Sequence, residues 1–127
     1  MKKFFMCMLA TLGLTTACAQ QNFENVDVQG FAKLLTDTSV VVLDVRTSSE
    51  YAEGHIQNSI LIDQGQSDFV EKAKATLPLH QKIAVYCRSG RRSANAASRL
   101  AEVGYKCVNL KGGIMAWRAA NMPITKE

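Results

Sequence analysis

The chain has 127 residues, of which 47% are hydrophobic and 20% charged; this composition excludes a disordered or collagen-like chain. The length predicts one domain, and a formal net charge of +4 is too small to indicate binding of nucleic acid. The four cysteines show no Cys-x-x-Cys spacing, so they indicate neither a disulfide framework nor a metal site, and nothing in the sequence predicts a cofactor.

The N-terminal residues have the layout of a secretory signal peptide. Two lysines follow Met1, an apolar run covers residues 4–14, and small residues precede Cys18. The apolar run is shorter than the ~20 residues that a membrane-spanning helix needs. We therefore predict that residues 1–17 are a signal peptide and that the protein is exported.

Cys18 directly follows Thr-Thr-Ala, which resembles the lipobox of bacterial lipoproteins, although Thr15 stands where that motif usually has leucine. The resemblance implies that Cys18 is acylated and becomes the first residue of the mature chain. Residues 18–26 are then predicted to be a lipid-anchored tether, because two or three acyl chains hold a protein firmly on a membrane. This interpretation places the protein on a membrane, facing the periplasm or the cell exterior. Cleavage near Ala19 without acylation is the alternative.

The remaining residues alternate between strand and helix patterns. Residues 40–45 and 82–87 are mostly apolar runs, typical of strands that are covered on both faces, whereas the helical segments have apolar residues three or four positions apart. In chain order we predict a helix over 28–36, a strand over 40–45, a helical turn over 48–53, a strand over 59–62, a helix over 67–77, a strand over 82–87, a helix over 93–103, a strand over 106–110, a turn at 112–113 and a helix over 114–121. The alternation predicts one α/β domain with a mostly parallel central sheet flanked by helices.

Cys87 ends a predicted central strand, at the edge of the sheet where open α/β folds bind ligands. The helix that follows presents free backbone N–H groups and the positive end of its dipole, and both favour thiolate over thiol. The connecting loop, here called the cysteine loop, consists of Arg88, Ser89, Gly90, Arg91 and Arg92. We predict that Cys87 is a nucleophile and that the site attracts a small dianion. The alternative is a buried structural cysteine beside arginines on a solvated turn.

Three segments of the chain resemble the rhodanese family of sulfurtransferases. They are LDVRTSSEYAEGHIQNSI at 43–60, VYCRSGRRSANAA at 85–97 and LKGGIMAW at 110–117, and they occur in the family's order. The resemblance implies a single rhodanese-like domain over 27–125. It also implies that Cys87 accepts a sulfane sulfur from a small anionic donor such as thiosulfate, becomes a persulfide and passes the sulfur to cyanide or a thiol. The backbone of the cysteine loop would hold the sulfur, and its arginine side chains would hold the oxyanion of the donor.

The length of the cysteine loop distinguishes sulfur transfer from phosphate hydrolysis within this superfamily. Phosphatase and arsenate-reductase relatives use a Cys-x5-Arg motif, but the sixth position after Cys87 is Ser93. The six residues from Cys87 to Arg92 suit a single sulfur atom and favour sulfur transfer. Two alternatives stay open: a persulfide carrier or thiol-redox protein that uses the same cysteine, and a binding module without catalysis.

Charged and aromatic residues outside the cysteine loop have structural interpretations. Asp44 and Arg46 end the neighbouring strand, and we predict that they brace the cysteine loop, with mutual pairing as the alternative. The family resemblance gives His55 a structural role. Trp117 lies at helical spacing after the Gly-Gly turn and is predicted to pack in the core.

Cys107 lies on the last predicted strand. If that strand is parallel to the strand over 82–87, Cys107 is level with Ile83, four residues or ~13 Å from Cys87. A disulfide needs Cα atoms within ~7 Å of each other. We therefore predict that Cys107 is a buried apolar residue rather than a partner of Cys87.

Overall fold

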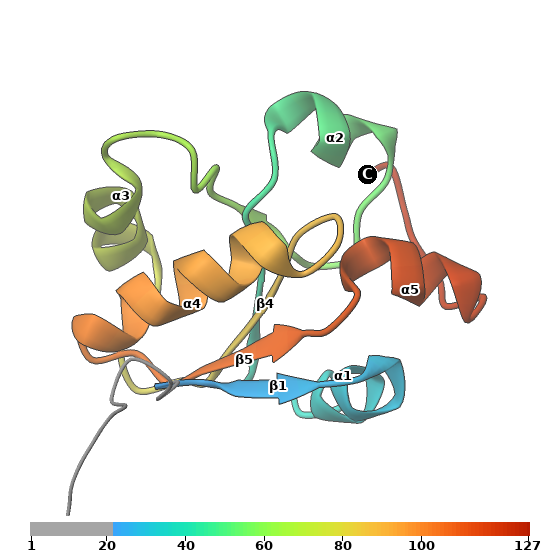
Figure 1. The fold of residues 1–127 in the computed structure, drawn as a ribbon, viewed down its shortest axis with the longest axis horizontal. Coiled ribbons are helices and arrows are strands. Elements are labelled where there is room, and N and C mark those ends of the chain that lie inside the picture. Colours follow the sequence, from blue (N-terminus) through green and yellow to red (C-terminus); the bar gives the residue numbers. More distant parts are fainter. Residues whose placement is uncertain (1–21) are drawn as a thin grey trace, which may run out of the picture.

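The computed structural model describes residues 22–127, which form a parallel five-stranded sheet with helices on both faces (Figure 1). The strands are β1 (Glu24–Val26), β2 (Val41–Asp44), β3 (Ile60–Leu61), β4 (Ile83–Tyr86) and β5 (Cys107–Leu110). The helices are α1 (Val28–Leu34), α2 (Ser48–Glu53), α3 (Phe69–Thr76), α4 (Arg91–Glu102) and α5 (Gly113–Ala119). The strand order is β1-β5-β4-β2-β3, and each neighbouring pair is parallel. The predicted fold class is confirmed.

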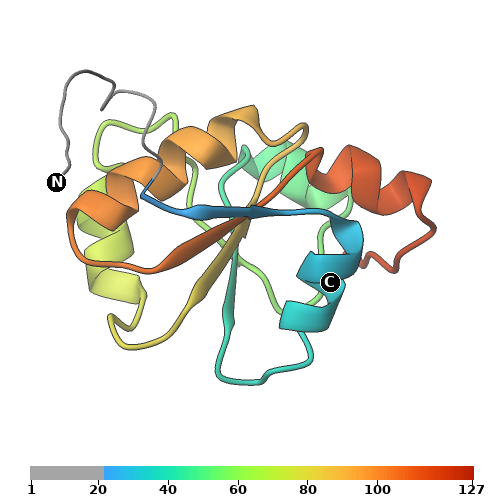
Figure 2. The ribbon, with the colours of Figure 1, turned by 60° about the horizontal axis from the view of Figure 1, so that its bottom comes forward.

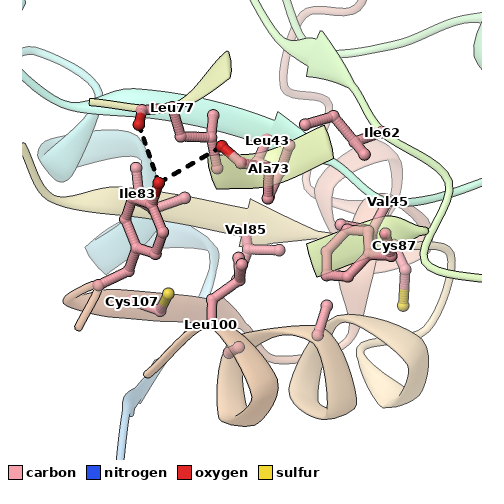
Figure 3. Close-up of a cluster of buried hydrophobic side chains, with 14 residues drawn as sticks. Leu43, Val45, Ile62, Ala73, Leu77, Ile83, Val85, Cys87, Leu100 and Cys107 are labelled. Carbon is pink, nitrogen blue, oxygen red and sulfur yellow. Dashed lines mark hydrogen bonds between the residues drawn. The ribbon is translucent and has the colours of Figure 1, made fainter. Parts of the chain in front are cut away.

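Each face of the sheet carries its own apolar core. Side chains alternate along a strand, so Ile83 and Val85 of β4 belong to one core and Ala84 and Tyr86 to the other. The first core packs against α3 and α4 and contains Cys87 (Figure 3). The second packs against α1 and α5, through residues such as Phe31, Ile114 and Trp117. Burial on both faces explains why the central strands are continuous apolar runs in the sequence.

The predicted position of Cys107 is confirmed. Cys107 pairs with Ile83 in the parallel register of β4 and β5, and it lies in the same apolar core as Cys87. Both cysteines are buried free thiols. Burial raises the pKa of the Cys107 thiol to about 12, so this thiol stays protonated at neutral pH.

The last three residues of the predicted tether over 18–26 form strand β1 instead, because Glu24 and Val26 pair with Val108 and Leu110 of β5. Figure 2 shows β1 as the extended blue segment that leads into α1. The strand has only three residues and the first two are exposed, so neither its length nor its hydrophobic pattern marks it in the sequence. The predicted signal peptide and the acylation site at Cys18 lie outside the described residues and stay predictions. Among residues 22–127, no helix combines the length and the apolar character that crossing a membrane requires.

The first turn of α5 contacts the loop that follows β4. The N–H of Ile114 donates to the Cys87 carbonyl at 2.9 Å, and the N–H of Met115 donates to the Arg88 carbonyl at 3.1 Å. Gly113 has φ +60°, and a Cβ at this position would overlap the carbonyl groups of Arg88 and Cys87. The Gly-Gly turn therefore brings α5 close enough to hold the backbone of the cysteine loop.

The close approach at Gly113 predicts a large cost for Gly113→Ala. Gly104 is the matched control, because it also has a positive φ of +102°, but a Cβ there would meet only Leu79 Cδ1 at 3.5 Å. Gly104→Ala should lower the free energy of unfolding by about 1–2 kcal/mol, the cost of the backbone conformation alone. Gly113→Ala should lower it by a further ~2 kcal/mol or more, because backbone must move as well. Urea unfolding measures the free energy of unfolding of both variants. An equal decrease in the two variants would contradict the close approach of Gly113 to the cysteine loop.

Candidate active site

Cys87 lies directly after β4, at the carboxyl end of the parallel sheet, and its sulfur is in hydrogen-bond contact with the first turn of α4. Cys87 is fully buried, with 0% of its surface exposed to solvent. Two groups donate hydrogen bonds to its Sγ: the N–H of Gly90 at 3.1 Å and the hydroxyl of Ser93 at 3.3 Å. The sulfur therefore has donors from both the cysteine loop and the first turn of α4.

Opposing effects act on the pKa of the Cys87 thiol. Burial is the largest and raises the pKa, because the thiolate loses its hydration. The Ser93 hydroxyl and the N–H groups of Ser93, Gly90 and Ser89 together lower the pKa, and the net result lies below the ordinary value of a cysteine. Cys107 is buried in the same core without such donors, and its pKa moves in the opposite direction. Of these two thiols, the geometry activates Cys87 alone.

The cysteine loop can direct its N–H groups at sulfur because its carbonyl groups are bonded elsewhere. The carbonyls of Cys87 and Arg88 accept from α5, and the Gly90 carbonyl accepts from Ala94 of α4 at 3.1 Å. Gly90 has φ +100°, and a Cβ there would lie 3.2 Å from backbone atoms of Leu110 and Gly112. The predicted curl of the loop at Gly90 thus depends on both a positive φ and the lack of a side chain.

The three arginines of the cysteine loop have two different environments. Arg92 makes a bidentate pair with Glu50, with both N···O distances 2.9 Å, and this links α4 to α2. That hydrogen bond is the main reason why the pKa of Glu50 falls to about 2, so the pair stays charged at neutral pH. Arg88 and Arg91 are exposed, and neither forms an ion pair within the described part of the chain. Of the three arginines in the cysteine loop, Arg88 and Arg91 therefore have side chains that are available to an incoming anion.

Asp44 and Arg46 do not brace the cysteine loop as predicted. Arg46 donates to the Asp44 carboxylate at 2.7–3.1 Å and to the Gly54 carbonyl at 2.8 Å, and within residues 22–127 no side-chain hydrogen bond from this pair reaches the cysteine loop. The pair is almost completely buried. It holds the turn after α2, because a buried charge needs each of its donors satisfied. The alternative of mutual pairing is the one observed.

The structural roles expected for His55 and Trp117 are confirmed. His55 is 2% exposed, its Nδ1 lies 2.9 Å from the Tyr51 carbonyl, and its ring stacks on the Tyr51 ring. The backbone of His55 also exchanges two 2.8 Å hydrogen bonds with Thr125. Trp117 is buried in the second core, with its Nε1 donating to the Pro123 carbonyl. Within residues 22–127, neither side chain forms a hydrogen bond to Cys87.

The sequence pattern did not single out Ser93 and Glu50 as site residues. Ser93 lies on the first turn of α4, which begins at Arg91, two residues earlier than predicted. A serine at the sixth position after the nucleophile was a usable signal, since one helical turn brings it back toward the sulfur. Glu50 completes a capping box with Thr47 at the start of α2, and its contact with Arg92 spans 42 residues, which local sequence cannot show.

The Cys87 thiol is buried, receives hydrogen bonds at its sulfur and lies at the carboxyl edge of a parallel sheet, and these features make it the candidate nucleophile of this α/β fold. The family model described as rhodanese-like domain matches residues 27–120. The chain belongs to this family: it has the rhodanese fold and is a sulfurtransferase of the rhodanese family. No group of three or more His, Cys, Asp or Glu side chains suited to a metal occurs within residues 22–127.

Individual relatives support the assignment over most of their length. A sulfurtransferase of Allochromatium vinosum is 33% identical over 101 residues, covering 78% of this chain and 92% of that protein. Thiosulfate sulfurtransferase 18 of Arabidopsis thaliana is 32% identical over 126 residues, covering 90% of this chain and 92% of that protein. Among solved structures, a rhodanese-related protein from Thermoplasma volcanium has a TM-score of 0.74 at 33% identity, covering 83% of this chain and all of that one.

The hydroxyl of Ser93 predicts a pH-dependent effect of Ser93→Ala. Removing this donor raises the pKa of Cys87 toward its ordinary value, so less thiolate is present at neutral pH. Alkylation of Cys87 by iodoacetamide should need a higher pH and should slow on the order of tenfold at pH 7, because a hydrogen bond to a charged group contributes ~1.5–3 kcal/mol. Ser98→Ala, on the same helix, is the control and should leave the profile unchanged. A Ser93→Ala profile identical to the parent's would refute the role of the hydroxyl.

Proposed function

We propose that the protein transfers a sulfane sulfur from thiosulfate to cyanide or a thiol through a persulfide on Cys87. In the first half-reaction the Cys87 thiolate attacks the outer sulfur of thiosulfate. An S–S bond forms to Cys87, the S–S bond of thiosulfate breaks, and sulfite leaves with the electron pair. In the second, cyanide attacks the terminal sulfur of the persulfide and leaves as thiocyanate, which restores the thiolate. Charge and atoms balance in both steps, and the covalent intermediate predicts ping-pong kinetics.

The observation that carries this proposal is the set of donors around the Cys87 sulfur. The Gly90 N–H and the Ser93 hydroxyl donate hydrogen bonds to this sulfur, and the nearby N–H groups of Ser89 and Ser93 also favour a negative charge there. Such donors stabilise the attacking thiolate, and when sulfur is added they are available to the anionic persulfide as well. The N–H donors are part of the backbone, so they need little rearrangement between the two half-reactions.

The proposed donor follows from charge and from the size of the loop. Arg88 and Arg91 are exposed cations on the same loop as the activated thiol, and α4 adds the positive end of its dipole. A small inorganic dianion fits this combination. The Arabidopsis relative named thiosulfate sulfurtransferase 18 supports the same choice.

Replacing each of the two buried thiols tests the role of Cys87. Cys87→Ser should abolish thiocyanate formation from thiosulfate and cyanide, because serine is not ionised at neutral pH. Cys107→Ser is the matched control, a change of the same size in the same core, and it should retain activity within a few-fold. Activity of Cys87→Ser equal to that of the parent would overturn the assignment. A parent that takes up sulfur but releases none to cyanide or thiols would instead be a persulfide carrier.

The environments of the arginines predict how donor binding depends on them. Arg88→Ala and Arg91→Ala should each raise the KM for thiosulfate about 1.4- to fivefold, which corresponds to the ~0.2–1 kcal/mol typical of exposed charge pairs. The effect should shrink as ionic strength rises. Lys74→Ala, an exposed change on α3, serves as the control for net charge. An unchanged KM in both arginine variants would mean that the backbone and the helix dipole alone bind the donor.

A further inference from the structure

Asn109 is a polar residue buried in an otherwise apolar part of the sheet. It lies on β5 between Val85 of β4 and Asn25 of β1, level with both in the strand register, and it is 2% exposed. Alternation along β5 puts its side chain on the same face as Cys107, the face that α4 covers. In Figure 1, β5 leads directly beneath the start of α4 and the cysteine loop.

The hydrogen bonds of the Asn109 amide are unevenly satisfied. Its Nδ2 donates to Asn25 Oδ1 at 2.9 Å and to the Gly90 carbonyl at 3.3 Å. Its Oδ1 is buried and has no hydrogen-bond partner among residues 22–127. A buried acceptor without a partner lowers the free energy of unfolding, and a leucine of similar size would avoid that loss. The asparagine therefore calls for an explanation other than stability.

Gly90 supplies that explanation, because it connects Asn109 to the reacting sulfur. Its carbonyl accepts from Asn109 at 3.3 Å as well as from the Ala94 N–H at 3.1 Å, and its own N–H donates to Cys87 Sγ at 3.1 Å. Glycine with φ +100° has no side chain to restrict its backbone, so its orientation depends on what binds its two polar groups. The Asn109 amide of β5 is the side-chain donor to the Gly90 carbonyl, whereas the N–H of Gly90 donates to the sulfur.

We propose that Asn109 is a positioning residue that orients Gly90 so that its N–H points at Cys87. The proposal rests on the proposed role of Cys87 as the reacting thiol. Within residues 22–127 no hydrogen bond joins Asn109 to the sulfur, so Asn109 acts through the Gly90 backbone. The competing explanation is a side-chain ladder between β1 and β5, in which the contact to Asn25 is the one that matters.

Alkylation of Cys87 by iodoacetamide tests the proposal without depending on any sulfur donor. The rate is followed against pH from the mass of the peptide that contains Cys87, for the parent, Asn109→Leu, Asn109→Ala and Asn25→Ala. Both Asn109 variants should move the profile to higher pH and slow alkylation at pH 7 roughly fivefold, as expected for one lost hydrogen bond. Asn109→Leu should also unfold at a urea concentration no lower than the parent's. Asn25→Ala should leave the alkylation profile in place.

Two outcomes would overturn the proposal. One is an alkylation profile like the parent's in the folded Asn109 variants. If the bulk of leucine prevents folding, Asn109→Ala still removes the same amide without adding volume. The other is a shift in Asn25→Ala as large as that in Asn109→Leu, which would assign the effect to the ladder between β1 and β5. Failure of the parent to form thiocyanate from thiosulfate would refute the proposed function instead, and the alkylation comparison would still decide the role of Asn109.

Discussion

A buried thiolate is stable only where N–H and O–H donors replace the water that it has lost, and this requirement organises the structure around Cys87. The donors come from the cysteine loop and the first turn of α4. They face the sulfur because the carbonyls of Cys87 and Arg88 are bonded to α5 and the Gly90 carbonyl to α4 and β5. Loosening any of these attachments would let loop carbonyls turn toward the sulfur, where they would repel its charge.

These attachments come from distant parts of the chain. This explains why a whole domain is needed to keep the hydrogen-bond donors in place around the sulfur of Cys87. The Gly-Gly turn after β5 brings α5 onto the loop, and Glu50 fixes Arg92 from α2. The buried Asp44–Arg46 pair secures the turn at Gly54, at the end of α2. The parallel sheet gathers these segments at one edge, since the carboxyl ends of its strands lie together.

Much of this arrangement was predictable from the sequence, because it is encoded locally. Continuous apolar runs marked the central strands, and a cysteine, a glycine and a helix start in close succession marked the site. The missing parts depend on contacts between distant residues. β1 is too short and too polar to show a strand pattern, the Glu50–Arg92 pair spans 42 residues, and the Asp44–Arg46 pair turns toward Gly54 rather than the cysteine loop. Asn109 became notable only when its burial was visible.

The central claim is that sulfur is carried covalently on Cys87, and mass spectrometry of the intact protein tests it most directly. After incubation with thiosulfate and removal of excess donor, the parent should gain the mass of one sulfur atom, located by digestion on the peptide that contains Cys87. Addition of cyanide should remove that mass and release thiocyanate in equal amount. A parent that gains no sulfur, or one that carries it on Cys107, would contradict the account.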